Sequence, residues 1–166
     1  MAGLLRNLIT LLLALPGVGR HLSNETLKIR FWASPLDAGI RNLKSDRYLQ
    51  FAECAQLDFI LRCGLLGKLM RQGLSFVNGS QLIRFQRPVR MFAIVEVRSR
   101  VLWFDERWAW FEHQFHSRGE LCATVLVKMK FKKGRLTVPP ATLLHCAGDS
   151  RPAPLDGWDA ALQELT

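Results

Sequence analysis

The sequence predicts an α+β domain in which a long, buried central helix packs against a five-stranded antiparallel sheet. Three observations lead to this prediction. Residues 47–63 carry apolar side chains at helical spacing on most sides, which is typical of a buried helix. After Gly73 the hydrophobic period changes to the two-residue alternation of strands. Four strand-like segments then follow with short connections, which favour antiparallel pairing.

The length of 166 residues fits one domain of ordinary size. We expect this domain at residues 24–146. A hydrophobic or amphipathic N-terminal helix should precede it within residues 1–20, and a peripheral C-terminal tail, residues 147–166, should follow. With 49% hydrophobic and 22% charged residues, the chain should fold rather than remain disordered.

The leucine-rich segment 1–15 ends at Pro16-Gly17 and is shorter than the roughly 20 apolar residues that a membrane span needs. Three interpretations stay open. The segment is an amphipathic helix lying on a membrane or on its own domain, a signal peptide with Arg6 at its charged start, or a core-packing helix. The first allows a cytoplasmic protein to contact a membrane peripherally through residues 1–20.

The charge balance favours polyanionic partners, since 23 Lys and Arg face 14 Asp and Glu, for a net charge of +9. A basic protein that docks on acidic lipid and binds no other ligand is one hypothesis. We expect no nucleic-acid partner, because Trp103, Trp108 and Trp110 form no evident stacking platform. The four cysteines include no C-x-x-C pair, so we expect reduced thiols and no metal site.

The first half of the domain should contain one strand and the central helix. Thr26–Ala33 alternates and is rich in β-favouring residues, and residues 34–39 form a loop. Ser45 or Asp46 can cap a helix that begins near Arg47. We expect this helix to stop at Arg62, before Gly64, and a short helical stretch to follow at Leu65–Arg71.

The second half should supply the other four strands. Val95, Val97, Val101 and Trp103 share one face of the second of these strands, and the last strand has the cleanest alternation. A helix at Leu155–Leu165 is expected in the tail. The four predicted strands are Phe76–Arg87, Met91–Phe104, Trp108–His116 and Leu121–Lys132.

Four short sequence motifs occur in a fixed order along the chain. They are Arg47-Tyr48-Leu49 with Glu53 after it, LDFILRCGLL at 57–66, RFQRP at 84–88 and FEHQF at 111–115. Together they resemble the hotdog-fold thioesterases of the 4-hydroxybenzoyl-CoA thioesterase type. More narrowly, the chain is similar to small acyl-CoA thioesterase-like proteins with a hydrophobic N-terminal leader. The resemblance covers residues 27–144.

The resemblance implies a hotdog fold and hydrolysis of an acyl-CoA thioester by a homodimer or a dimer of dimers. Coenzyme A would be part of the substrate, and no separate cofactor is expected. Family members usually carry D-x-D-x-x-x-H-x-N-N-x-x-Y before the helix. Counted back from Tyr48, this chain departs from that word, which leaves a catalytically silent protein that binds acyl thioesters or scaffolds a membrane-linked assembly as the alternative. The residues at the five positions are Leu36, Ala38, Asn42, Lys44 and Ser45.

Thioester hydrolysis needs a carboxylate to activate water or attack the carbonyl, and an amide to stabilise the oxyanion. Asp37 in the loop is one candidate, although a turn-forming aspartate bonded to its own backbone explains it better. Asp46 is better explained as a helix cap. Asn42, at the histidine position, could bond a thioester oxygen or be an exposed loop residue. The oxyanion donor would be a backbone amide within residues 45–47.

Glu53 is the third catalytic candidate. It lies on the same side of the predicted helix as Leu49 and Gln56, so we expect a half-buried carboxylate, whose pKa would be raised. The alternative is an ion pair with Arg84 at a subunit contact. His113, on an inward strand face, is best explained as a core histidine.

Two groups of basic residues are candidates for binding the phosphates of coenzyme A. Arg84 and Arg87 belong to the first predicted strand after the helices, and Lys130 and Lys132 belong to the last strand. A solvated sheet face that keeps the protein soluble would account for the same charges without any ligand.

Overall fold

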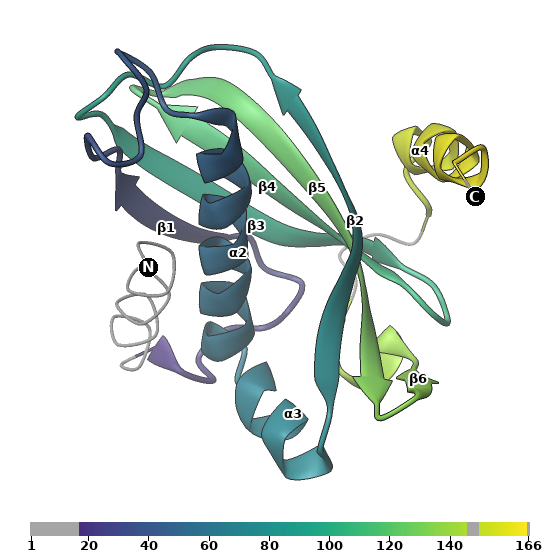
Figure 1. The fold of residues 1–166 in the computed structure, drawn as a ribbon. Coiled ribbons are helices and arrows are strands. Elements are labelled where there is room, and N and C mark those ends of the chain that lie inside the picture. Colours follow the sequence, from purple (N-terminus) through teal and green to yellow (C-terminus); the bar gives the residue numbers. More distant parts are fainter. Residues whose placement is uncertain (1–16, 146–149, 166) are drawn as a thin grey trace.

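The computed structural model describes residues 17–145 and 150–165, so most of the predicted N-terminal helix lies outside the described residues. A long helix, α2 (Ser45–Arg62), runs across a strongly curved antiparallel sheet (Figure 1). A short helix, α3 (Leu65–Gln72), follows it, and a C-terminal helix, α4 (Pro154–Gln163), lies apart from both. The predicted α+β architecture of a long helix against an antiparallel sheet is confirmed.

The sheet follows the order β1-β3-β4-β5-β2, and every pairing is antiparallel. A sixth strand, β6, pairs with β5; at three residues it is too short to show a hydrophobic period, so the sequence predicted only five. The bounds are β1 Leu27–Trp32, β2 Ser75–Phe85, β3 Ile94–Phe104, β4 Ala109–Ser117, β5 Glu120–Lys133 and β6 Leu136–Val138.

Strands β2 and β3 do not form a hairpin, although only residues 86–93 separate them. β2 pairs with β5, whereas β3 lies between β1 and β4. The amides of Gln86 and Arg87 both donate to the carbonyl of Cys122, at 2.8 and 2.9 Å, which carries the chain over the start of β5. As a result β1 and β2 form the two opposite edges of the sheet.

The inner face of the sheet packs on α2 and forms the main hydrophobic core. Phe51 and Phe59 of α2 are fully buried. The Phe59 ring meets Phe111 of β4 edge to face at 5.5 Å, and the Phe51 ring stacks on Phe31 of β1 at 4.8 Å. The central helix is therefore buried for the reason that its apolar pattern indicated.

The start of α2 differs from the predicted cap. Ser45 is the first residue of the helix rather than its cap, and Lys44 occupies the cap position without a side-chain hydrogen bond. At the other end the helix stops as expected, because Gly64 takes a left-handed conformation with φ of 67°.

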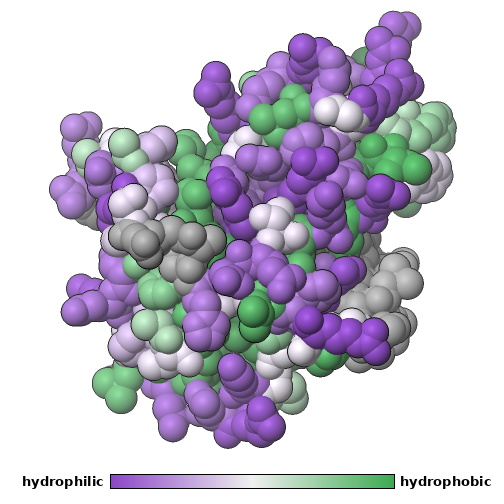
Figure 2. Space-filling model, turned by 180° about the vertical axis from the view of Figure 1, so that it is seen from behind, coloured by the Kyte–Doolittle hydropathy of each residue, from purple (hydrophilic) through white to green (hydrophobic). Residues whose placement is uncertain are grey.

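The outer face of the sheet is mostly hydrophilic, with hydrophobic residues in separate small patches (Figure 2). One patch forms a second core, in which Trp110 packs against Leu155 and Trp158 of α4. Trp103 joins this cluster, so its predicted place beside Val101 on the inner face is wrong. The register shift between Val101 and Trp103 breaks the two-residue alternation and turns the indole to the outer face.

Among the residues that the structure describes, no helix is both long and apolar enough to cross a membrane.

Candidate active site

Asp37 lies in the loop before α2 and is completely buried. Its carboxylate oxygen Oδ2 accepts hydrogen bonds from the Ser34 hydroxyl at 2.6 Å and the Ser34 amide at 3.3 Å. The other oxygen lies 4.0 Å from Nε of Arg47, in the first turn of α2. Asp37 therefore closes a turn and ties the loop to the helix, as the turn-forming interpretation expects.

Asn42 is exposed and is held through its backbone. Its carbonyl accepts a hydrogen bond from the Gly39 amide at 2.8 Å, and an isolated bridge pairs it with Arg90. The side chain is thus free to meet a ligand from solvent. It lies on the same loop as Asp37, but the two side chains differ completely in access to water.

Glu53 lies on α2 and is exposed, so the predicted half-burial is wrong for the single chain. Gln56, on the same side of the helix, shows the reason. The amide of Gln56 contacts Asn78 of β2 at 3.4 Å and the sulfur of Met129 at 2.9 Å. This side of α2 therefore faces β2, the edge of the sheet, and within residues 17–145 and 150–165 no further strand covers the helix beyond it. Glu53 makes no ion pair with Arg84 or any other described residue.

Tyr48 fixes the first turn of α2 against the end of β2, a role that the sequence analysis did not assign to it. Its hydroxyl accepts a hydrogen bond from the Val89 amide at 3.3 Å, and its ring meets Phe85 edge to face at 5.2 Å. Burial raises the pKa of Tyr48 above its ordinary value of 10.0. The residue was visible in the sequence as the tyrosine of the Arg47-Tyr48-Leu49 word.

The start of α2 also presents backbone amides. Lys44 caps the helix without its side chain, and the Arg47 amide donates to the Lys44 carbonyl at 3.0 Å. The amides of Ser45 and Asp46 are left without an acceptor among the described residues. The positive end of the helix dipole lies at the same place. These groups suit the stabilisation of a developing oxyanion.

The structure divides the four candidate phosphate-binding residues into two distant pairs. Arg84 pairs with Thr124 in the ladder, six residues along β5 from Lys130, which places Arg84 and Lys130 roughly 20 Å apart. Arg84 and Arg87 lie at the end of the sheet where α2 begins. The ammonium of Lys130 lies over the Trp108 ring at 4.7 Å, toward the other end of β5. The two pairs cannot hold one phosphate group together.

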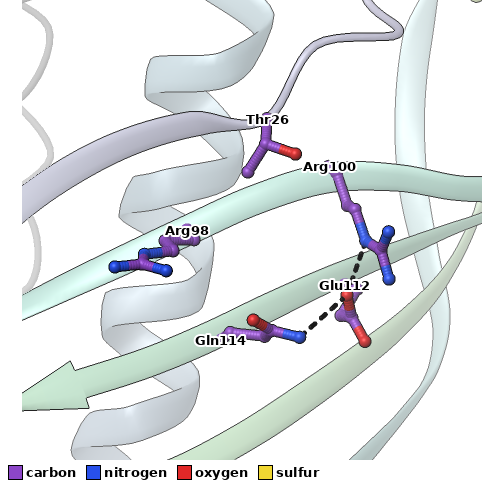
Figure 3. A pocket seen from close by; sticks show the side chains of 5 residues that line it. All are labelled: Thr26, Arg98, Arg100, Glu112 and Gln114. Carbon is purple, nitrogen blue, oxygen red and sulfur yellow. Dashed lines mark hydrogen bonds and ion pairs between the residues drawn. The ribbon is translucent and has the colours of Figure 1, made fainter. Parts of the chain in front are cut away.

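The outer face also carries a polar depression of about 220 Å³ (Figure 3). Its charged groups are largely neutralised, since Nε of Arg100 lies 2.6 Å from the Glu112 carboxylate and Nε of Arg98 lies 3.0 Å from Glu96. The sheet separates this depression from α2, as Figure 3 shows, so it does not belong to the candidate active site. Its lining residues are Thr26, Arg98, Arg100, Glu112 and Gln114.

His113 occupies the inner core, as the sequence predicted. Its Nδ1 lies 2.8 Å from the Ser99 hydroxyl, and no described group pairs with its Nε2. Burial lowers the pKa of His113 to about 3, so the ring is neutral at ordinary pH. A neutral, fully enclosed ring has no access to a substrate in this structure.

A long central helix packed against a strongly curved antiparallel sheet is the arrangement of the hotdog fold. The chain belongs to the thioesterase-like superfamily, whose family model matches residues 38–156. The predicted hotdog fold and thioesterase family are therefore confirmed, whereas the narrower resemblance to relatives with a hydrophobic N-terminal leader stays a prediction, because residues 1–16 lie outside the described residues.

Similarity to curated proteins covers about half of this chain. The chain is 25% identical to Protein THEM6 of Drosophila melanogaster over 80 residues. The aligned segment covers 48% of this chain and 42% of that protein. It is 35% identical to Thioesterase lcsJ of Purpureocillium lilacinum over 82 residues. That aligned segment covers 46% of this chain and 26% of that protein. The match thus covers less than half the length of either relative.

A solved structure with the same fold is the DHNA-CoA thioesterase from Staphylococcus aureus. Its TM-score is 0.61 at 14% identity, and the alignment covers 84% of this chain and 90% of that one. At this identity the likeness shows the fold.

Proposed function

We propose that this protein hydrolyses an acyl-CoA thioester, as a homodimer paired through β2, with Glu53 as the carboxylate that acts on the thioester. Membership of the thioesterase-like superfamily supports the reaction, and the name of the Staphylococcus aureus enzyme supports a CoA ester as the substrate class. The observation that carries the proposal is Glu53 itself. It is an exposed carboxylate without an ion partner among the described residues, and the other residues of α2 from Arg47 to Arg62 are buried or half-buried.

The edge strand β2 supports the dimer. It is 11 residues long, and one of its two sides has no partner strand among the described residues. Val77 and Leu82 are each 44% exposed there. A long apolar edge strand is unusual in a monomer, because it invites pairing with another strand. Antiparallel pairing of two β2 strands would place a second subunit beside Glu53.

The mechanism assigns two roles. In one route Glu53 takes a proton from water, the water oxygen bonds to the carbonyl carbon, the C–S bond breaks, and the departing thiolate of coenzyme A receives the proton. In the other, Glu53 attacks the carbonyl carbon, the thiolate leaves, and water then cleaves the resulting anhydride to release the acid and free Glu53. The free amides at the start of α2 stabilise the negative charge on the thioester oxygen. About 12 Å of helix separate Glu53 from Ser45, and side chains on a helix tilt toward its start, so the carbonyl would bind between them.

Arg84 and Arg87 are the better candidates for the phosphates of coenzyme A, because they lie at the end of the sheet where α2 begins. Arg87 is not fully free, since its Nη1 lies 2.6 Å from Glu120. An exposed pair of this kind exchanges partners at little cost. Lys130 and Lys132 would serve a phosphate only at the other end of the strand.

The test measures thiol release from short, aromatic and long acyl-CoAs. We expect Glu53→Gln to lower kcat by about a hundredfold or more. The matched control is Glu106→Gln, which makes the same change at an exposed carboxylate in the turn between β3 and β4 and should leave kcat unchanged. Full activity of the Glu53→Gln protein would contradict the proposed role.

A catalytically silent protein that binds acyl thioesters is the second candidate, because Asp37 is enclosed and Asn42 replaces the histidine of the family word. Coenzyme A binding without turnover of any substrate would favour it.

The dimer is tested separately by light scattering of the Leu82→Lys protein, which should be a monomer at concentrations where the native chain is a dimer.

A further inference from the structure

We propose that the end of the molecule where β1 ends and α2 begins docks on the surface of an anionic lipid bilayer. The docking surface is an apolar tip formed by Trp32, Phe92 and Ile94. This inference concerns a different edge of the sheet from β2, and it does not depend on the hydrolytic activity.

The three side chains of the apolar tip are exposed together. Trp32 is 56%, Phe92 61% and Ile94 63% exposed. Trp32 and Ile94 are direct partners in the β1–β3 ladder, and the rings of Trp32 and Phe92 lie 6.0 Å apart. A cluster of large apolar side chains in water is costly unless something covers it.

The backbone holds Phe92 in this position at a cost. Its φ is 67°, in the left-handed region that a bulky side chain rarely adopts. The Phe92 amide donates to the Ala33 carbonyl at 2.8 Å, and the Met91 amide donates to the Arg41 carbonyl at 2.8 Å. The ring is therefore presented to solvent by a fixed loop.

Positive charge surrounds the apolar tip. The Ser117 hydroxyl donates to the Ile94 carbonyl at 3.2 Å, which brings the turn with Arg118 close to Ile94. Carboxylates at this end are compensated or enclosed: Glu120 pairs with Arg87, Asp46 lies 3.5 Å from Arg47, and Asp37 is buried. The exposed cations at this end include Arg41, Lys44, Arg90 and Arg118.

This combination fits a lipid surface better than a protein partner. Peripheral binding to membranes sums buried apolar area and attraction to anionic headgroups. Tryptophan favours the boundary between water and acyl chains. Because α2 begins at the same end, docking would bring the loop of Asp37 and Asn42 to the membrane surface (Figure 1).

The test uses the full chain with vesicles of phosphatidylcholine and phosphatidylglycerol in equal parts, and with phosphatidylcholine alone. We expect sedimentation with the anionic vesicles, weakened by salt. The triple variant Trp32→Ser, Phe92→Ser, Ile94→Ser should bind the anionic vesicles at least about tenfold more weakly than the native chain. Phe92→Gly is a second variant that removes one ring and also suits the backbone, so it should fold and bind more weakly than the native chain.

The matched control is Met70→Ser with Leu136→Ser, which removes two equally exposed apolar side chains from α3 and β6, at the other end of the sheet. It should bind vesicles like the native chain. Equal binding by the triple variant, or failure of the native chain to bind, would overturn the proposal. The proposal would also be overturned if the main effect of the triple substitution, measured by light scattering, were a smaller oligomer. The apolar tip would then be a contact between copies of the chain.

Discussion

The inner face of the sheet, which packs on α2, and the outer face, which is partly covered by α4, differ in what they bury. The inner face forms one continuous core with Phe51, Phe59 and Phe111 fully enclosed. The outer cluster buries only Trp110, Leu155 and Trp158 completely or nearly so. Around that cluster, ion pairs and cation–π contacts replace apolar area.

The polar contacts of α4 centre on Asp159. Its carboxylate accepts a hydrogen bond from Lys128 of β5 at 2.6 Å and another from Arg151. The Arg151 guanidinium lies over the rings of Trp103 and Trp110 at 4.8 and 4.9 Å. A few directional contacts thus suffice to position a helix on a sheet, whereas the fold itself depends on the inner core.

The largest effect should come from Phe59→Ala on the inner face. The ring is fully buried against Phe111, and its removal leaves a cavity that the surrounding core cannot close. We expect a loss of about 4 kcal/mol in the free energy of unfolding, measured by urea denaturation. Phe92→Ala, which removes an exposed ring, is the control and should cost far less. Similar losses for both would contradict the described burial.

Acid should weaken the inner face next. The unfolded chain binds a proton at His113 below its ordinary pKa of 6.5, whereas the native ring does so only near pH 3. Stability present above pH 6.5 is therefore lost as the pH falls toward 3, at about 1.4 kcal/mol per pH unit, which amounts to about 2 kcal/mol between pH 6.5 and pH 5. Denaturation curves across this range should show that slope in the native chain. The His113→Leu protein should lack it, and an unchanged slope would contradict the assignment.

Trp158→Ala should loosen the outer cluster at a smaller cost, about 2 kcal/mol, because the cluster is small and lies partly near solvent. Limited proteolysis should then cut α4 away while the rest of the domain stays folded. Leu165→Ala, which changes a side chain 83% exposed at the end of the chain, is the matched control. Unfolding of the whole domain by Trp158→Ala would show that the two faces are not independent.

The smallest effect should follow Asp159→Asn, about 1 kcal/mol. Burial favours the neutral acid, but hydrogen bonds from Lys128 and Arg151 outweigh it and hold the pKa of Asp159 below its usual 3.8. The stability that this pair adds is present above pH 3.8 and is lost below it, a lower window than that of His113. The measurement is the melting temperature of the variant and of the native chain. The variant should melt lower than the native chain at neutral pH, and the difference should shrink as the pH falls below 3.8.

The inner core could be predicted from the sequence because its signals are local. Apolar side chains recur at helical spacing in residues 47–63, and apolar and polar side chains alternate along the 14 residues of β5. The sequence of each element therefore predicts which of its sides is buried. The bounds of most elements came within a few residues. Strand β3 begins at Ile94 rather than Met91, because Phe92 turns the chain with a positive φ.

The outer face and the candidate site could not be predicted in the same way, because they depend on contacts between distant segments. The gathering of Trp103, Trp108 and Trp110 under α4 requires a register shift that no local pattern shows. The exposure of Glu53 depends on where β2 lies in the sheet, and its partner β5 follows it by about 35 residues in sequence. Helical spacing gives the side of the helix but not what covers that side.

The unpaired side of β2 also governs how the chain behaves during refolding. Free amide and carbonyl groups along 11 residues will accept any extended segment of another molecule, including one that has not finished folding. Crowded refolding mixtures should therefore lose material to fibrous by-products that bind amyloid dyes. Dilute mixtures should recover the native chain, and a charge placed at Leu82 should extend that recovery to higher concentrations.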